Sequence, residues 1–448
     1  MKKRVLAVTV GLAITAGAAP AWANNGMENI AYSAQSEGRG GTAIAVGDDT
    51  SVMNTNPALL SNIENGRVDA SMTMMFPQYS LQNANNDTSG MKPIFVIPTM
   101  GLTTKLTNRL SFGIAFFNEG GTGTDYGQVK VRDTGNGTNP PGITLMEYYS
   151  MFGYMVVAPT LSYKATDDLS VGVSAQPGFA TARMKMPFNM TTLGMGIWAA
   201  DMNMHDYNYR TKLGALYKIN DAMGFGFAYT TKADINLRGN ASMQTASFGG
   251  TGVINYMTGK AAADMGWPSS FKLGTYWDMR NMGMPRMSLD IERINWSEYY
   301  KSVPFHMSNI VWQGTPVPIN MDMQMNLGWE DQTVYKLGFE MPFSDTITMR
   351  MGWSHGKNPV PSSGLLAIMN PIVEDHYTMG LGIKPNKKFD FDMAMTLGVR
   401  NRQTNNTSNT VEATPIGGGT PFGASQDMNG TTIGMKYYTM SMGIGYKW

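Results

Sequence analysis

The chain of 448 residues contains no cysteine, so it can form neither disulfide bonds nor thiolate metal sites. It has only four histidines, which leaves little material for a metal or acid–base site, and neither G-x-S-x-G nor H-E-x-x-H occurs. Charged residues make up 15% and the formal net charge is +1, so no overall field attracts nucleic acid. We therefore expect a protein that is not an enzyme and has no cofactor, metal or nucleic-acid partner.

Long apolar runs are missing as well. After the first 23 residues, no run approaches the roughly 20 apolar residues that a membrane-spanning helix needs. The mean hydropathy of −0.21 argues against a helical membrane protein, whereas the low charge argues against a fully solvated surface. Both hold when apolar and polar residues alternate, because the averages then hide an apolar face. In a bilayer, the architecture that fits is a closed β-barrel.

The first residues are typical of a cleavable export signal. A positively charged stretch at residues 2–4 precedes an apolar stretch at residues 5–18, and Ala21-Trp22-Ala23 fits a small-x-small cleavage site. The apolar part is short for a retained transmembrane anchor, which is the alternative interpretation. We predict a signal peptide over residues 1–23 and export of the rest of the chain.

Alternation of apolar and polar residues runs through the rest of the chain. One example is the apolar face formed by Phe389, Phe391, Met393, Met395, Leu397 and Val399. Period two indicates a β-strand, and fourteen such segments can be distinguished. Their connections alternate between short turns and long segments, which are residues 81–92, 119–146, 187–205, 239–267, 298–331, 355–375 and 401–433. This asymmetry is typical of outer-membrane barrels, with short turns in the periplasm and long loops outside.

We therefore predict an all-β fold, a 14-stranded antiparallel transmembrane β-barrel over residues 66–448. In its last strand, Met440, Met442, Ile444, Tyr446 and Trp448 share the outward face. Aromatic rings are favoured at the bilayer interface, where such a strand would end. Tyr446 and Trp448 also resemble the C-terminal signal that the barrel-assembly machinery reads, although Phe is commoner than Trp at its end. The sequence thus predicts a bacterial outer-membrane protein.

Residues 24–65, which we call the N-terminal segment, do not alternate. Asp48, Asp49 and Thr50 offer helix-capping side chains before residues 51–60. The lumen of fourteen strands is wide enough to need filling, and the segment is too apolar for a free tail. We predict a small helical plug inside the barrel, with a periplasmic tail as the alternative.

Several segments of the sequence resemble a known family. Residues 29–63 contain GRGGTAIAVGDD followed by NTNPALL, which resembles the N-terminal hatch of the FadL/TodX transporters of long-chain fatty acids and hydrocarbons. Asn56-Pro57-Ala58 matches the NPA motif of that family. The similarity continues through residues 209–240, 267–300 and 333–361 and so covers essentially the whole mature chain.

The resemblance implies passive transport of hydrophobic small molecules across the outer membrane. In this family the hatch plugs the lumen, and ligand passes from an external apolar groove to an interior site. It then leaves sideways through a gap at a kink in the third strand. We expect long-chain fatty acids as the ligand, with aromatic or alkane hydrocarbons as the alternative. We also expect a monomer surrounded by outer-membrane lipid and lipopolysaccharide.

Rival functions of other classes are a hydrophilic porin and a structural or adhesin barrel. A porin would pass sugars, whereas a plugged lumen would exclude them. An adhesin would depend on its loops for surface binding and would not take up hydrophobic compounds.

Candidate site residues follow from the residues and the resemblance together. Asn56, Pro57 and Ala58 form either a local helix cap or a contact between hatch and wall. Glycines beside a strand break suit a bulge, so the predicted lateral opening comprises Gly113, Asn118, Gly120 and Gly121, unless the strand simply ends there.

Two further groups concern the ligand itself. Apolar loop residues indicate binding, so the predicted groove comprises Phe188, Met190, Leu193, Met195, Ile197 and Trp198, although a loop packed on its neighbours is the alternative. A carboxylate would need a cation, for which we name Arg183, Arg350 and Lys357. Inward-facing charges can instead pair across the lumen, because unpaired buried charges are costly.

Overall fold

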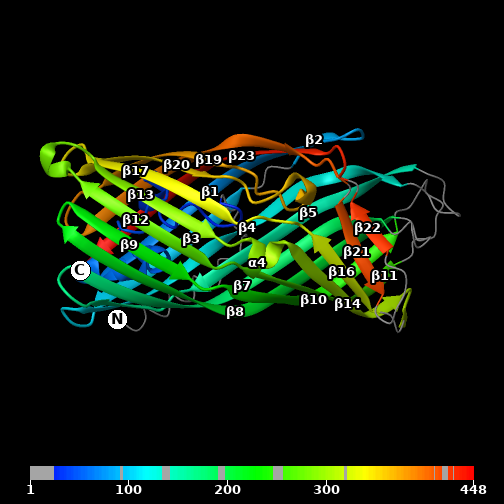
Figure 1. The fold of residues 1–448 in the computed structure, drawn as a ribbon, viewed down its shortest axis with the longest axis horizontal. Coiled ribbons are helices and arrows are strands. Elements are labelled where there is room, and N and C mark those ends of the chain that lie inside the picture. The colour runs from blue at the N-terminus through cyan, green and yellow to red at the C-terminus, as the bar shows by residue number, and fades with distance from the viewer. Residues whose placement is uncertain are drawn as a thin grey trace.

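The computed structural model describes residues 25–90, 94–133, 142–189, 197–245, 256–316, 320–407, 409–415, 422–426 and 428–448. The predicted signal peptide lies outside these ranges. The chain forms a closed antiparallel β-barrel of fourteen strands, as predicted (Figure 1). The barrel closes where the first wall strand pairs with the last over the full range from Arg67↔Lys447 to Gln82↔Thr432.

Fourteen strands, several of them interrupted, make up the wall. They are β1 (Arg67–Gln82), β3 (Phe95–Lys105), β4 (Leu110–Asp133), β5 with β6 (Gly142–Val157, Thr160–Lys164), β7 (Leu169–Asn189), β8 (Ile197–Asn220), β9 with β10 (Met223–Thr230, Ala233–Thr245), β11 with β12 (Tyr256–Trp267, Ser270–Asp278), β13 with β14 (Arg286–Ile294, Ser302–Trp312), β16 with β17 (Met321–Asn326, Gln332–Pro342), β18 (Ile347–Gly356), β19 (Asp375–Ile383), β20 (Phe389–Thr404) and β23 (Thr432–Lys447).

Shorter elements lie in the connections. They are α2 (Ala34–Gly38), α3 (Val52–Thr55), η1 (Pro57–Asn62), β2 (Asp87–Ser89), η3 (Arg280–Met282), α4 (Ser297–Tyr300), β15 (Thr315–Pro316), η4 (Ser362–Gly364), β21 (Asn409–Pro415) and β22 (Phe422–Gln426). In the part of the chain that the structure describes, no helix is long and apolar enough to cross a membrane.

The outward face of the wall carries a band of exposed apolar side chains. Methionines form much of it on one side of the barrel, where Met351, Met379, Met395 and Met440 are cross-strand neighbours. Trp448 is exposed at the end with the short turns, and Tyr377 and Tyr438 are exposed towards the other end. An apolar band between aromatic side chains is the surface that a bilayer requires.

The face of the strands that carries apolar side chains changes between the two ends of the barrel, as β8 shows. Towards the short turns, Leu213 points outward and Lys212 is buried inside, whereas towards the long loops Asn203 points outward and Met202 and Trp198 are buried. Outside the bilayer the outward side chains of the strands face water and are polar. The inward side chains are shielded from water there, so they can be apolar. The barrel therefore extends well beyond its membrane band.

This extension corrects the predicted loops. The ranges 119–146, 187–205 and 239–267 consist largely of strand, because β4 pairs with β5, β7 with β8, and β10 with β11 far beyond the predicted ends. The predictions were wrong because they followed an apolar outward face, which is lost where the strands leave the membrane.

The N-terminal segment lies inside the barrel, and its described part begins at Asn25. Helix α2 contacts β18, β19, β20 and β23, whereas η1 contacts β4, β6, β7 and β8 on the other side. Contacts with both sides of a closed wall place the segment in the lumen, at the end with the short turns (Figure 1, dark blue). It separates this end from the rest of the lumen, towards the long loops, which we call the upper lumen.

Introducing a cation on the lipid-facing surface tests the position of the bilayer. Met395→Lys should destabilise the barrel by about 2–4 kcal/mol, because the side chain lies between the aromatic levels. Val399→Lys, on the same face of β20 but beyond Tyr377 and Tyr438, should cost only about 0–1 kcal/mol. Urea unfolding in lipid vesicles measures both, and equal losses would contradict the assigned position.

Candidate ligand pathway

The NPA motif joins the N-terminal segment to the wall. Asn56 caps η1, because its Oδ1 accepts a hydrogen bond from the Ala58 backbone N–H at 3.1 Å. Its Nδ2 donates to the carbonyl of Ile44 at 2.7 Å and to that of Ala215 on β8 at 2.9 Å. Pro57 occupies the first turn, where a missing N–H leaves no backbone group unpaired. The motif is thus both a cap and a wall contact.

Two glycines on the wall allow Asn56 and Pro57 to lie directly against the strands. Gly172 on β7 and Gly214 on β8 are direct cross-strand partners. A Cβ on Gly214 would lie 2.1 Å from Asn56 Oδ1, and one on Gly172 would lie 2.4 Å from the carbonyl carbon of Pro57. Only the absence of a side chain at both positions lets the motif approach the wall this closely.

Buried ion pairs attach the N-terminal segment at several further points. Glu28 binds Lys272 on β12 at 2.6 Å, and Lys272 also binds Glu292 on β13. Arg39 binds Glu340 on β17 at 3.0 Å. The inward-facing charges of the wall therefore pair with the segment as well as with one another. Removing one partner from such a pair would strand a buried charge, which is strongly destabilising.

The wall is interrupted between β3 and β4. These strands pair from Lys105↔Ser111 only as far as Met100↔Phe116, although β4 continues to Asp133 beside β5. The residues of β3 before Met100 still pair with β1 on their other side. Beyond Phe116, no wall strand within the described residues pairs with the edge of β4 that faces β3.

The N-terminal segment occupies this free edge in place of β3. Asn29 donates from its backbone N–H to the carbonyl of Glu119 at 3.2 Å and from its side chain to that of Asn118 at 2.8 Å. The N–H of Gly121 donates to the carbonyl of Met27 at 2.9 Å. Because unpaired backbone groups are costly in a membrane, this pairing is what makes the interruption tolerable.

A β-bulge lies in β4 at the same level. The register with β5 shifts between Asn118 and Gly120, so that Glu119 is the extra residue, and Gly120 has a φ of 142°. The side chain of Glu119 turns into the lumen and binds Arg210 on β8 at 2.6 Å. Tyr32 of the N-terminal segment donates its hydroxyl to the same carboxylate at 3.1 Å.

The Tyr32 hydroxyl acts as a neutral donor in this contact. Burial, together with the carboxylates of Glu119 and Glu28, raises the pKa of Tyr32 well above its ordinary value. The bond between the bulge and the N-terminal segment is therefore independent of tyrosine ionisation near neutral pH.

The predicted lateral opening is thus only partly at the interruption. Asn118, Gly120 and Gly121 lie at the bulge, beside the free edge. Gly113 lies elsewhere, because it pairs with Thr103 on β3 and with Thr160 on β6 in an intact ladder. The structure therefore does not place Gly113 at the interruption, and the lateral opening itself stays a prediction.

An apolar cavity lies in the upper lumen. It is lined by Thr122, Ser150, Met151, Phe152, Ala182, Met184, Met265, Val303, Phe305, Met325, Leu327, Ile368 and Met369. Five of these thirteen residues are methionine and none is charged, which suits varied apolar ligands because methionine adapts its shape.

The cavity could not be located from the sequence. Its residues come from β4, β5, β7, β11, β14 and β16, from the break between β16 and β17, and from the connection between β18 and β19. Most of them fall in segments predicted to be loops. One sequence feature did indicate an apolar lumen at this level: methionine and alanine alternate with polar residues along β7 and β8.

The predicted groove is largely outside the described residues. Met190, Leu193 and Met195 lie there, and of Phe188 only the backbone, at the end of β7, is described. Ile197 and Trp198 belong to β8 and are buried, so the prediction of an exposed loop is wrong for them. Trp198 packs edge-on against Trp312, with 6.0 Å between ring centroids. A role in binding ligand stays a prediction.

None of the three named cations lines the cavity. Arg350 is buried and binds both Glu340, at 2.8 Å, and Asp392, at 2.6 Å. Arg183 points outward and pairs with Asp201, and Lys357 is exposed at a loop. We do not retain these residues as a carboxylate site, because their charges are compensated or directed away from the lumen.

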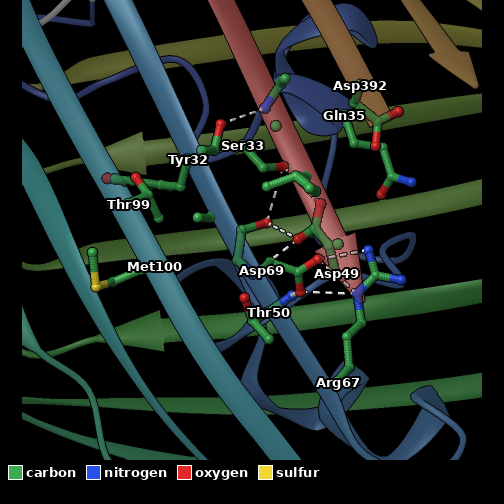
Figure 2. Close-up of a pocket in the computed structure, with 17 residues that line it drawn as sticks. Tyr32, Ser33, Gln35, Asp49, Thr50, Arg67, Asp69, Thr99, Met100 and Asp392 are labelled. Carbon is green, nitrogen blue, oxygen red and sulfur yellow. Dashed lines mark hydrogen bonds and ion pairs between the residues drawn. The ribbon is translucent and has the colours of Figure 1, made fainter. Parts of the chain in front are cut away.

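A second pocket lies between the N-terminal segment and strands β1, β3 and β23 (Figure 2). Ser33 donates to Asp49 at 2.8 Å, and the Thr50 N–H donates to Asp69 at 2.9 Å. Arg67 binds Asp69 within β1 and so fixes the carboxylate that accepts from Thr50. This polar lining holds the segment in place and offers no apolar surface comparable with that of the upper cavity.

A family model for outer membrane protein transport proteins (OMPP1/FadL/TodX) matches residues 14–440. The chain belongs to the OMPP1/FadL/TodX family. This confirms the predicted membership in a family of passive outer-membrane transporters of hydrophobic compounds, which are not enzymes. A comparison with curated protein sequences found no match.

Solved structures of similar fold come from several bacteria. The Pseudomonas putida toluene transporter TodX has a TM-score of 0.75 at 17% identity, covering 95% of this chain and 100% of that one. The Ralstonia pickettii toluene transporter TbuX has a TM-score of 0.69 at 16% identity, covering 93% and 98%. A Pseudomonas aeruginosa FadL homologue has a TM-score of 0.71 at 14% identity, covering 94% and 99%. At these sequence identities the similarity establishes a shared fold and nothing further.

Adding one methyl group tests the close contact at the NPA motif. Gly214→Ala should lower the stability of the transporter by about 1–3 kcal/mol, because the added Cβ overlaps Asn56. Gly443→Ala is the matched control, since its Cβ would meet its nearest neighbour at an ordinary 3.6 Å. Urea unfolding and proteolysis of the N-terminal segment measure the effect, and similar behaviour of both variants would refute it.

Proposed function

We propose that this transporter takes up uncharged hydrophobic molecules through the apolar cavity in the upper lumen. The observation that carries the proposal is the lining of that cavity, which combines methionine, aromatic and aliphatic side chains with two hydroxyls. Transfer of an apolar ligand from water into such a site is favourable and needs no energy source. The N-terminal segment below the cavity blocks direct passage to the periplasm.

The lining favours hydrocarbons over the long-chain fatty acids that the sequence placed first. A fatty-acid carboxylate in the cavity would find no cation among the lining residues, and burying an unpaired charge is costly. The hydrocarbon alternative has no such cost. That two transporters of similar fold are described as toluene transporters agrees with this choice.

The interruption between β3 and β4 provides the proposed exit. Its free edge is paired with Met27 and Asn29, so displacement of these residues would open the wall sideways. Ligand would then reach the outer membrane rather than the periplasmic water. The monomeric state, the contacts with lipopolysaccharide and the assembly signal at Tyr446 and Trp448 stay predictions from the sequence.

Filling the cavity tests the proposed binding site. Ala182→Trp should reduce toluene uptake by whole cells at least tenfold, because the indole would occupy the lumen at an inward-facing position of β7. Thr181→Trp, at the adjacent outward-facing position, should leave uptake unchanged. Parallel assays with oleate separate the two ligand classes, and saturable oleate uptake without toluene uptake would refute the hydrocarbon proposal.

Removing the bulge tests the proposed exit. Deletion of Glu119 should abolish uptake, because it removes the extra residue and allows β4 to continue in register beside its neighbours. Glu119→Asp keeps both the bulge residue and a carboxylate that can pair with Arg210. This control should fold, as judged by its heat-modifiable migration on gels, and retain uptake. Normal uptake by the deletion variant would exclude an exit at the bulge.

A further inference from the structure

The connection between β18 and β19, residues 357–374, folds into the lumen instead of extending outward. Its central residues 365–370 are almost completely buried, with Met369 the most exposed at 8%. A loop at the outer end of a barrel would ordinarily remain hydrated, because its backbone groups need partners. Here the wall supplies those partners, and we call residues 357–374 the lid.

The base of the lid is hydrogen-bonded to β20 and the residue just after it, one strand beyond β19 along the chain. Gln403 donates to the carbonyl of Val360 at 2.8 Å, and Asn401 donates to that of Ile372 at 2.7 Å. Asn405 donates to the carbonyl of Leu365 at 3.0 Å. Two amides on β20 and that of Asn405, just after its end, thus hold both arms of the lid close to this side of the wall.

The tip of the lid crosses to the opposite wall, where β4 and β5 hold it. Thr124 on β4 donates its hydroxyl to the carbonyl of Ala367 at 3.2 Å, and Ser150 on β5 donates to that of Ile368. Asn370 of the tip donates to the hydroxyl of Tyr126 at 3.1 Å. All of these bonds are neutral, so each contributes little and none leaves a charge behind when it breaks.

The tip also forms the ceiling of the apolar cavity. Ile368 and Met369 belong to its lining, beside Thr122 of β4 and Phe152 of β5. Thr124 and Ser150, which hold the tip, lie one inward-facing position further towards the long-loop end of the same strands. The tip therefore covers the cavity on the side from which an external ligand would come.

We infer that the lid is the entry gate of the cavity and that Ile368 and Met369 limit the size of the ligand it admits. A ligand from outside reaches the cavity when the tip releases β4 and β5 while the base stays on β20. Apolar contacts with the ligand then replace those that the tip loses. The inference rests on the proposed uptake function and adds the element that controls entry and selects by size.

The absence of native cysteine allows a reversible test. In the full-length transporter, Thr124→Cys combined with Ala367→Cys would be joined by a short bifunctional methanethiosulfonate, which dithiothreitol releases. Locking the tip should reduce toluene uptake at least tenfold, and reduction of the same sample should restore it. Recovery in that sample shows that the variant is folded.

A matched cross-link separates the lid from the wall. Lys130→Cys with Leu145→Cys joins direct cross-strand partners at exposed positions of β4 and β5 and leaves the tip untethered, so uptake should continue. Full uptake with the tip locked would overturn the inference while leaving the proposed function intact. No toluene uptake by the unmodified transporter would instead refute the proposed function.

Shortening the two ceiling residues tests their part in selection. Ile368→Ala combined with Met369→Ala should raise uptake of biphenyl relative to toluene several-fold, because the ceiling then leaves room for a second ring. An unchanged ratio, with uptake of toluene preserved, would show that these side chains do not limit ligand size.

Discussion

The architecture of this transporter depends on the N-terminal segment serving as a strand partner for the free edge of β4. A barrel wall in a bilayer must satisfy every backbone N–H and carbonyl, and an open edge is therefore normally excluded. Asn29 donates to the carbonyls of Asn118 and Glu119, and the Met27 carbonyl accepts from Gly121, so this part of the edge is satisfied without joining the continuous sheet. The same hydrogen bonds thus attach the N-terminal segment to the wall and satisfy the backbone at the interruption.

Packing and charge hold that segment against the rest of the wall. Gly172 and Gly214 allow the NPA motif to touch the strands, and the pairs Glu28–Lys272 and Arg39–Glu340 attach it across the lumen. These polar contacts make the lower lumen a dense, charged layer. The upper lumen has the opposite character, because the strands above the membrane turn polar residues outward and leave methionine and tryptophan inside. The apolar cavity follows from this reversal.

Much of the fold was predictable, and the errors share one cause. Alternation, turn spacing and the aromatic last strand indicated the fourteen-stranded barrel, and the GRGG and NPA residues indicated the family. The predicted loops were wrong where β7 and β8 continue as a polar-outside hairpin, since an aqueous outer face removes the apolar pattern that marked the membrane strands. Arg350 was named as a ligand for a carboxylate because the sequence does not reveal its partners Glu340 and Asp392.

By itself, the sequence determined the closed barrel, its even number of strands and an N-terminal segment unlike the wall, because these properties depend on local periodicity and short motifs. The tertiary structure alone decided where β3 leaves β4, which residues line the cavity and that residues 357–374 fold inward as a lid. Each of these features requires contacts between residues far apart in the chain, such as Thr124 with Ala367 and Asn29 with Asn118. Such contacts leave no periodic trace in the sequence.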